Sequence, residues 1–314
     1  MTCDCDQHTP KQPLKAFSDA LTNMLEKAVP VVEILDTSLL DALDLVLAED
    51  ICAPFDVPPH NNSAMDGYAV KSIDMAAPCT LEMVGTLLAG QNFTGELKSG
   101  QCLRIMTGAP VPASSDAVVM QENVTASGTR IQINKVVSQG ANIRKAGEDI
   151  AHGALVLRKG EKLNPTDLGL LASLGFERVK TFRKIKVAVM STGDELVAPG
   201  DTRLPGQIFE SNRFVVMSML KRLNVEIVDL GIVEDSEDAI RSAFARASEQ
   251  ADVIVSSGGV SVGDADFVKQ ILSEMGEIDF WKLAIKPGKP FAFGHLDTAY
   301  FMGLPGNPVS ATVT

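Results

Sequence analysis

Apolar residues recur at helical spacing in three segments of the chain. Residues 14–28 carry apolar side chains every three to four positions, which predicts an amphipathic helix that ends before a proline. Residues 38–47 begin with a capping serine and predict a second helix. Residues 164–175 begin with Asn-Pro, end with Gly and predict a third helix.

Between residues 52 and 149 the pattern changes to short apolar runs separated by Gly, Pro and Asn, which predicts a β-rich domain. Ser127-Gly128 is typical of a hairpin turn between two strands. The clearest predicted strands are Thr80–Leu88, Leu103–Met106, Ala117–Met120 and Arg130–Ile133.

From residue 184 onward, strands and helices alternate, beginning with a continuous apolar run over Ile185–Met190. This alternation predicts a parallel sheet with right-handed crossovers, so residues 184–314 form one doubly wound α/β domain. Further predicted strands are Val225–Leu230, Val253–Val255, Lys282–Ile285, Phe291–Phe293 and Tyr300–Met302, and predicted helices are 211–223, Glu237–Ala247 and Phe267–Leu272. A last helix begins at Asn307-Pro308 just before the sequence stops, which indicates that a C-terminal part is missing.

Composition narrows the classes of partner. The net charge of −12 argues against nucleic-acid backbones and anionic membranes as partners. No apolar run is long enough to span a membrane, and the N-terminus does not resemble a signal peptide. The five cysteines favour reduced thiols and a cytoplasmic protein. Cys3, Cys5 and His8 are compatible with a metal clip, but a disordered polar tail is the preferred interpretation.

Candidate chemistry lies in four loops that follow the predicted strands, at the edge where open α/β sheets bind ligands. Glycine turns there present backbone N–H groups to an oxyanion, and Lys286 and Lys289 add positive charge. Nearby carboxylates suit Mg²⁺ beside a phosphate, which favours metal-assisted phosphoryl or nucleotidyl chemistry. Taken singly, each motif is better explained as a turn or a helix cap. The four loops are 191–195, 256–266, 286–290 and 303–308.

Other ligand classes find no support. There is no Gly-x-Gly-x-x-Gly after a strand and no Walker A sequence, and the four histidines form no zinc pattern. The β-rich region adds three polar loops, at residues 61–70, 104–110 and 144–149, each of which is by itself more typical of a turn than of a site.

Eight motifs together resemble the MoeA family, whose eukaryotic relatives include the E domain of gephyrin. They follow the family's order from about residue 14 to the last residue. The motifs are SAMDGYAV (63–70), RIMTGAPVP (104–112), AVVMQE (117–122), GEDI (147–150), STGDEL (191–196), SSGGVSVGDADF (256–267), KPGKPFAFG (286–294) and GLPGNPVSAT (303–312).

The resemblance implies a multi-domain α/β protein. Residues 14–51 and 150–183 would form an elongated helical domain, residues 52–149 a β-rich domain, and residues 184–314 a MogA-like molybdopterin-binding domain. A further β-barrel-like domain would follow residue 314.

The resemblance also implies a reaction: a Mg²⁺-dependent transfer of molybdenum from molybdate to adenylylated molybdopterin, with release of AMP. The family active site forms between the subunits of a homodimer, and partners would include a MogA-like adenylyltransferase and molybdoenzyme-maturation proteins. The implied catalytic residues are Asp66, Thr107, Asp149, Glu195, Asp235 and Asp266, with Glu195 and Asp266 as metal ligands. The implied substrate-binding residues are Arg144, Ser257, Gly258, Gly259, Ser261, Lys282, Lys286, Lys289, Pro290, Pro305 and Pro308.

Two alternatives stay open: a MogA-like molybdopterin adenylyltransferase and a gephyrin-like scaffold without catalysis. The N-terminal domains argue against the first, and the intact acidic residues argue against the second. Phe209-Glu210-Ser211-Asn212 replaces the Tyr-Asp-Thr-Asn often found in relatives, so these four residues are uncertain as substrate contacts.

Overall fold

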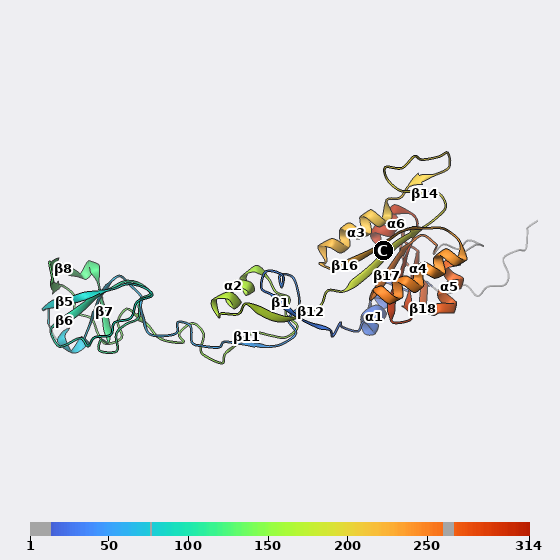
Figure 1. Cartoon of the computed structure of the whole chain (residues 1–314). Helices are drawn as coiled ribbons and strands as arrows, with labels where there is room; N and C mark the ends of the chain where they lie inside the picture. The colour runs from blue at the N-terminus through green and yellow to red at the C-terminus, as the bar shows by residue number, and fades with distance from the viewer. Residues whose placement is uncertain (1–13, 76, 260–266) are drawn as a thin grey trace, which may run out of the picture. The chain divides into compact units, whose positions relative to one another are not determined.

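The computed structural model describes residues 14–75, 77–259 and 267–314. The chain divides into two compact units (Figure 1). We call residues 14–35 and 181–314 the α/β unit, and residues 36–180 the inserted unit, because its sequence interrupts that of the first.

The α/β unit is built on a six-stranded sheet with the order β16-β13-β17-β20-β19-β18. The first four strands are parallel, as predicted. Strand β19 runs opposite to them and pairs antiparallel with both β20 and β18, so the prediction of a wholly parallel sheet is wrong there. The connections over residues 283–289 and 297–298 hold no crossover helix, and a parallel pair would need one. The strands are β13 (Lys186–Thr192), β16 (Glu226–Val233), β17 (Val253–Ser257), β18 (Gly276–Lys282), β19 (Pro290–Leu296) and β20 (Ala299–Leu304).

Helices cover both faces of this sheet because alternate residues of β13 point to opposite sides. Ala188 and Met190 belong to the core that includes α4 (Glu237–Gln250) and α5 (Phe267–Met275). Val187 and Val189 belong to the core on the other face, which includes α1 (Phe17–Lys27), α3 (Asn212–Arg222) and α6 (Pro308–Val313). None of the helices in the described ranges combines the length and apolar character needed to cross a membrane.

Helix α1 lies in the α/β unit, although the sequence analysis assigned it to the helical domain. Its Ala20 is buried in the α/β core, and Tyr300 fixes its C-terminal end. The Tyr300 hydroxyl donates to the Lys27 carbonyl at 2.5 Å and accepts from the Val29 N–H at 2.7 Å. Helical periodicity shows that a helix buries one face, but it does not show which partner covers that face.

The two outer segments of the inserted unit share one core, as a two-segment domain requires. Only α2 (Pro165–Ser173) is an α-helix among its described residues, and Asn164 caps it as predicted. The predicted helix over residues 38–47 is wrong, because the chain turns at Asp44 (φ 62°) and Leu47 then bonds to Glu161. The shared core consists of Ala42, Leu47, Ile51, Leu157, Leu163, Leu171 and Val179.

The β-rich region between these segments holds a second six-stranded sheet, with the order β7-β4-β6-β5-β9-β8. The hairpin at Ser127-Gly128 joins β8 to β9 as predicted, with Gly128 at φ 60°. The strands are β4 (Gly67–Val70), β5 (Thr80–Leu87), β6 (Gln101–Ile105), β7 (Ala117–Met120), β8 (Val124–Ser127) and β9 (Arg130–Ile133). Shorter strand pairs are β1 (Ile34–Ser38) with β12 (Arg178–Phe182), β2 (Ile51–Cys52) with β11 (Leu155–Leu157), and β3 (Asn62–Ser63) with β10 (Ile143–Arg144).

Candidate functional site

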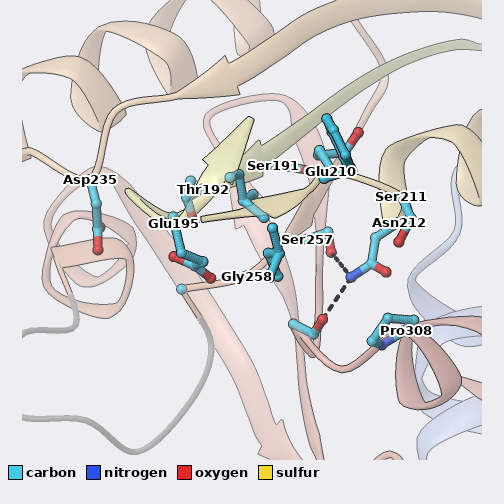
Figure 2. A pocket seen from close by; sticks show the side chains of 16 residues that line it. Ser191, Thr192, Glu195, Glu210, Ser211, Asn212, Asp235, Ser257, Gly258 and Pro308 are labelled. Carbon is cyan, nitrogen blue, oxygen red and sulfur yellow. Dashed lines mark hydrogen bonds between the residues drawn. The ribbon is translucent and has the colours of Figure 1, made fainter. Parts of the chain in front are cut away.

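A pocket of about 290 Å³ lies at the carboxyl edge of the α/β sheet (Figure 2). It lies where β13 has β16 on one side and β17 on the other, the switch point at which open α/β sheets bind ligands. In Figure 2, Asp235 and Glu195 are on the left, and Asn212 and Pro308 are on the right. The lining residues are 191–193, 195–196, 208–212, 235, 257–259, 306 and 308.

The glycine turn after β17 packs tightly against the end of β13. Gly258 and Gly259 have φ values of 94° and 68°, which favour glycine. A Cβ on Gly258 would lie 2.4 Å from the Thr192 carbonyl oxygen, so a side chain there would displace backbone. The Gly258 N–H donates to the Leu304 carbonyl at 3.2 Å. The expectation that this N–H is free to bind an oxyanion is therefore wrong.

The left side of the pocket is acidic. Glu195 and Asp235 line it, and Asp194 accepts a bond from the Asp235 N–H at 3.3 Å. Burial raises the pKa of the Asp235 carboxyl, and the charges of Asp194 and Glu195 raise it further. None of the described residues that line the pocket is a lysine or an arginine. An anion would therefore enter this pocket only with a cation or with basic groups from elsewhere.

A buried ion-pair network supports the opposite wall. Glu210 is 2% exposed and accepts from the Ser191 hydroxyl at 3.0 Å and from the Arg213 N–H at 2.7 Å. The Arg213 guanidinium lies between Glu210 and Asp229 and pairs with both. Two negative charges therefore flank the one buried positive charge of Arg213, and Asp229 is partly exposed. The sequence analysis left Glu210 as an uncertain contact and did not identify Arg213.

Asn212 connects three segments at this wall. Its side-chain Nδ2 donates to the Ser257 hydroxyl oxygen at 2.8 Å and to the Gly306 carbonyl at 2.9 Å (Figure 2). The start of α3 is thus tied to the end of β17 and to the loop after β20. The sequence left Asn212 as an uncertain substrate contact and carried no signal for these two partners.

The structure brings together part of the predicted site. Glu195, Asp235, Ser257, the Gly258-Gly259 pair and Pro308 all line the pocket. Ser261 and Asp266 lie outside the described residues. Pro305 is buried and does not line the pocket. The other four predicted residues do not line it either: Lys282, Lys286, Lys289 and Pro290.

The two lysines of the 286–290 loop are exposed at the same edge of the sheet as the pocket. Pro290 pairs with Lys282, and Ala292 pairs with Gly303 near the end of β20. The loop therefore lies beside the carboxyl end of β20. The expectation that all four loops open onto one pocket is confirmed for three of them and wrong for this one, because β18 and β19 extend the sheet by two strands beyond β20.

The predicted residues of the inserted unit form two contacting pairs. Thr107 donates to Asp66 through both its N–H and its hydroxyl, and these bonds lower the pKa of Asp66, the backbone bond most. Arg144 forms an ion pair with Asp149. Strand β3 joins the two pairs, because Ser63 bonds to Gly108 and Ala109 on one side and pairs with Ile143 on the other.

No preformed metal cage is seen: within residues 14–75, 77–259 and 267–314, no three His, Cys, Asp or Glu side chains are arranged to hold a metal ion. Of the two predicted metal ligands, Glu195 lines the pocket and Asp266 lies outside the described ranges.

Comparisons with known families match both parts of the chain. Residues 15–175 match the model of the MoeA N-terminal region (domain I and II), and residues 188–314 match that of a probable molybdopterin binding domain. The chain belongs to the MoeA family. The pocket of this MoeA-family chain therefore lies within the part that matches the molybdopterin-binding model.

Named relatives extend the match over nearly the whole chain. A molybdopterin molybdenumtransferase of Haemophilus influenzae is 48% identical over 300 residues, which cover 95% of this chain and 74% of the relative. A molybdopterin molybdenumtransferase of Nostoc is 35% identical over 325 residues, which cover 98% of this chain and 74% of the relative. The crystal structure of a MoeA molybdopterin biosynthesis protein from Pyrococcus horikoshii has a TM-score of 0.84 at 34% identity, covering 95% and 76%. The predicted MoeA family and MoeA-like fold are confirmed, whereas the further C-terminal domain stays a prediction.

Proposed function

We propose that this chain is a molybdopterin molybdenumtransferase that transfers molybdenum from molybdate to adenylylated molybdopterin and releases AMP. The observation that supports this most is the placement of the pocket. It lies at the switch point of the unit that matches a molybdopterin-binding model, and the relatives named above carry this activity in their names.

The pocket offers groups for a substrate that carries phosphate. Ser257 and the Gly258-Gly259 turn form one wall with little side-chain bulk, so a phosphate could approach the backbone closely. Molybdate would bind outside this pocket, at the same edge of the sheet, near Lys286 and Lys289 and with Ser261 as a further donor. A tetrahedral dianion needs nearby positive charge to replace the water that it loses on binding.

The acidic side of the pocket fits Mg²⁺ that is held jointly by protein and substrate. Mg²⁺ in nucleotide enzymes usually takes one or two carboxylates and completes its shell with phosphate oxygens and water. Glu195 would supply such a carboxylate, with Asp266 as the predicted second ligand, and Asp235 lines the same pocket as Glu195. Bound Mg²⁺ would supply positive charge on this side of the pocket, whose described lining has no lysine or arginine.

The second set of predicted residues, Asp66, Thr107, Arg144 and Asp149, lies in the inserted unit. We propose that these residues serve the pocket of a second copy in a homodimer. Arg144 would then bring a basic group to a pocket whose described lining has none. Light scattering on the full chain tests this arrangement, and a monomer at micromolar concentration would contradict it.

The activity itself is tested with the purified chain, adenylylated molybdopterin, molybdate and Mg²⁺. The proposal expects AMP release that depends on molybdate, together with activation of a cofactor-free molybdoenzyme. Adenylylation of molybdopterin from ATP would identify a MogA-like adenylyltransferase instead. A folded dimer that catalyses neither of these reactions would favour a scaffold.

A further inference from the structure

The contacts of Asn212 fix the orientation of its side-chain amide. The Gly306 carbonyl oxygen can only accept a hydrogen bond, so the amide atom 2.9 Å from it must be the donor Nδ2. A flipped amide would place two acceptors against each other. The same Nδ2 lies 2.8 Å from the Ser257 Oγ, so Asn212 donates to that hydroxyl. Asn212 is only 8% exposed, and its neighbours hold it in place.

This donation determines what the Ser257 hydroxyl can do. A serine hydroxyl has one proton to donate and lone pairs to accept with. Asn212 occupies the accepting side, and among the described residues no acceptor takes the Ser257 proton. Ser257 lines the pocket, so its proton is available to a ligand there.

Two neighbouring donors at this end of the pocket are already engaged. The Ser191 hydroxyl donates to Glu210 at 3.0 Å, and the Gly258 N–H donates to Leu304 at 3.2 Å. We propose that Asn212 is a positioning residue that holds the Ser257 hydroxyl as a hydrogen-bond donor to an oxyanion in the pocket. Identifying that oxyanion as a phosphate of the adenylylated pterin rests on the proposed function.

The inference is tested by a double-mutant cycle on AMP binding, measured by calorimetry with the full chain. Asn212→Leu keeps the side-chain size without adding charge and removes the donor, so the Ser257 hydroxyl is no longer held toward the ligand. Ser257→Ala removes that proton. Each variant should weaken AMP binding about tenfold, the value of one hydrogen bond to a charged group. Because Asn212 acts through Ser257, the double variant should bind no more weakly than S257A alone.

Ser257→Thr is the matched control, since it keeps the hydroxyl and should keep most of the affinity. If Asn212→Leu does not fold, as judged by near-ultraviolet circular dichroism, Asn212→Ala takes its place in the cycle. Independent effects that multiply to about a hundredfold in the double variant would overturn the inference, as would unchanged AMP binding in S257A.

The cycle needs no turnover, so its failure is distinguishable from failure of the proposed function. Coupled effects on AMP binding without molybdate-dependent AMP release would support the inference and contradict the function. Normal molybdenum insertion, together with independent effects of the two substitutions on AMP binding, would support the function and contradict the inference.

Discussion

One oxygen of the Asp66 carboxylate accepts both hydrogen bonds that Thr107 offers, from the N–H and from the hydroxyl, each at 2.8 Å. Thr107→Val keeps the first bond and removes the second. We expect the pKa of Asp66 to rise toward its ordinary value without reaching it, because the backbone bond lowers it most. Thr107→Ser should leave the pKa low. Nuclear magnetic resonance titration of the Asp66 carboxyl measures both, and equal pKa values in the two variants would contradict the role of the hydroxyl.

Glu195 follows a strand end and is exposed at the pocket, so it can be removed without loss of core packing. Glu195→Ala should lower molybdenum insertion about a hundredfold, as loss of a group that stabilises charge in a reaction does, and should leave the melting temperature nearly unchanged. Asp201→Ala is the matched control, because Asp201 is an exposed carboxylate of the following loop that does not line the pocket. Full insertion activity in folded Glu195→Ala would contradict a catalytic role for Glu195.

Asp235 should destabilise the folded protein at neutral pH. Its pKa is raised on folding, so ionisation at pH 7 costs more in the folded state than in the unfolded state. Asp235→Asn removes that cost, and its melting temperature at pH 7 should exceed that of the wild type. The difference should shrink as pH falls and vanish at about pH 3, roughly one unit below the ordinary aspartate pKa, where the carboxyl is neutral in both states. A lower melting temperature for Asp235→Asn at pH 7 would show that its carboxylate is stabilised by a partner instead.

Lys286 and Lys289 are predicted to bind molybdate. Lys286→Ala/Lys289→Ala should lose molybdate binding by more than about tenfold while AMP binding survives, because two charges near a dianion are removed. Lys98→Ala/Lys135→Ala removes two exposed lysines of the inserted unit and controls for net charge. Calorimetry with each anion separately distinguishes the outcomes. Retained molybdate binding together with loss of the adenylylated pterin would place these lysines at the pterin phosphate instead.

The sequence predicted most elements whose signal is local. The apolar run of β13, the Asn164 cap of α2 and the turn at Gly128 each depend on residues within a few positions, and each is present. The predicted helix over residues 38–47 failed because its leucines satisfy a helical period and a turn-rich loop equally well. The bonds of Leu47 to residues more than a hundred positions away decided between the two.

The sequence predicted those site residues whose strands could be ordered from the alternation of strands and helices. Ser257, Glu195 and Asp235 follow parallel strands, so alternation of strands and helices was enough to bring them to one edge. The 286–290 loop follows β18, which the pairing of β19 with β20 places two strands beyond β20, and the pattern did not reveal this strand order. Asn212 and Arg213 act through partners on other strands, and one-dimensional spacing carries no signal for such contacts.

The α/β unit is interrupted in sequence, and the core around Leu47 draws on two separate segments of the inserted unit, which has a consequence during synthesis. Leu47 emerges from the ribosome about a hundred residues before its core partners Leu157 and Val179, a delay of roughly 5 to 20 s at ordinary translation rates. The delay is longer for helix α1, because the first strand that covers its Ala20 is β13 and is synthesised later still. The β-rich sheet draws its six strands from one continuous stretch and can form first. The nascent chain therefore carries the uncovered apolar face of α1 through most of its translation, and this segment is where we expect chaperones to bind.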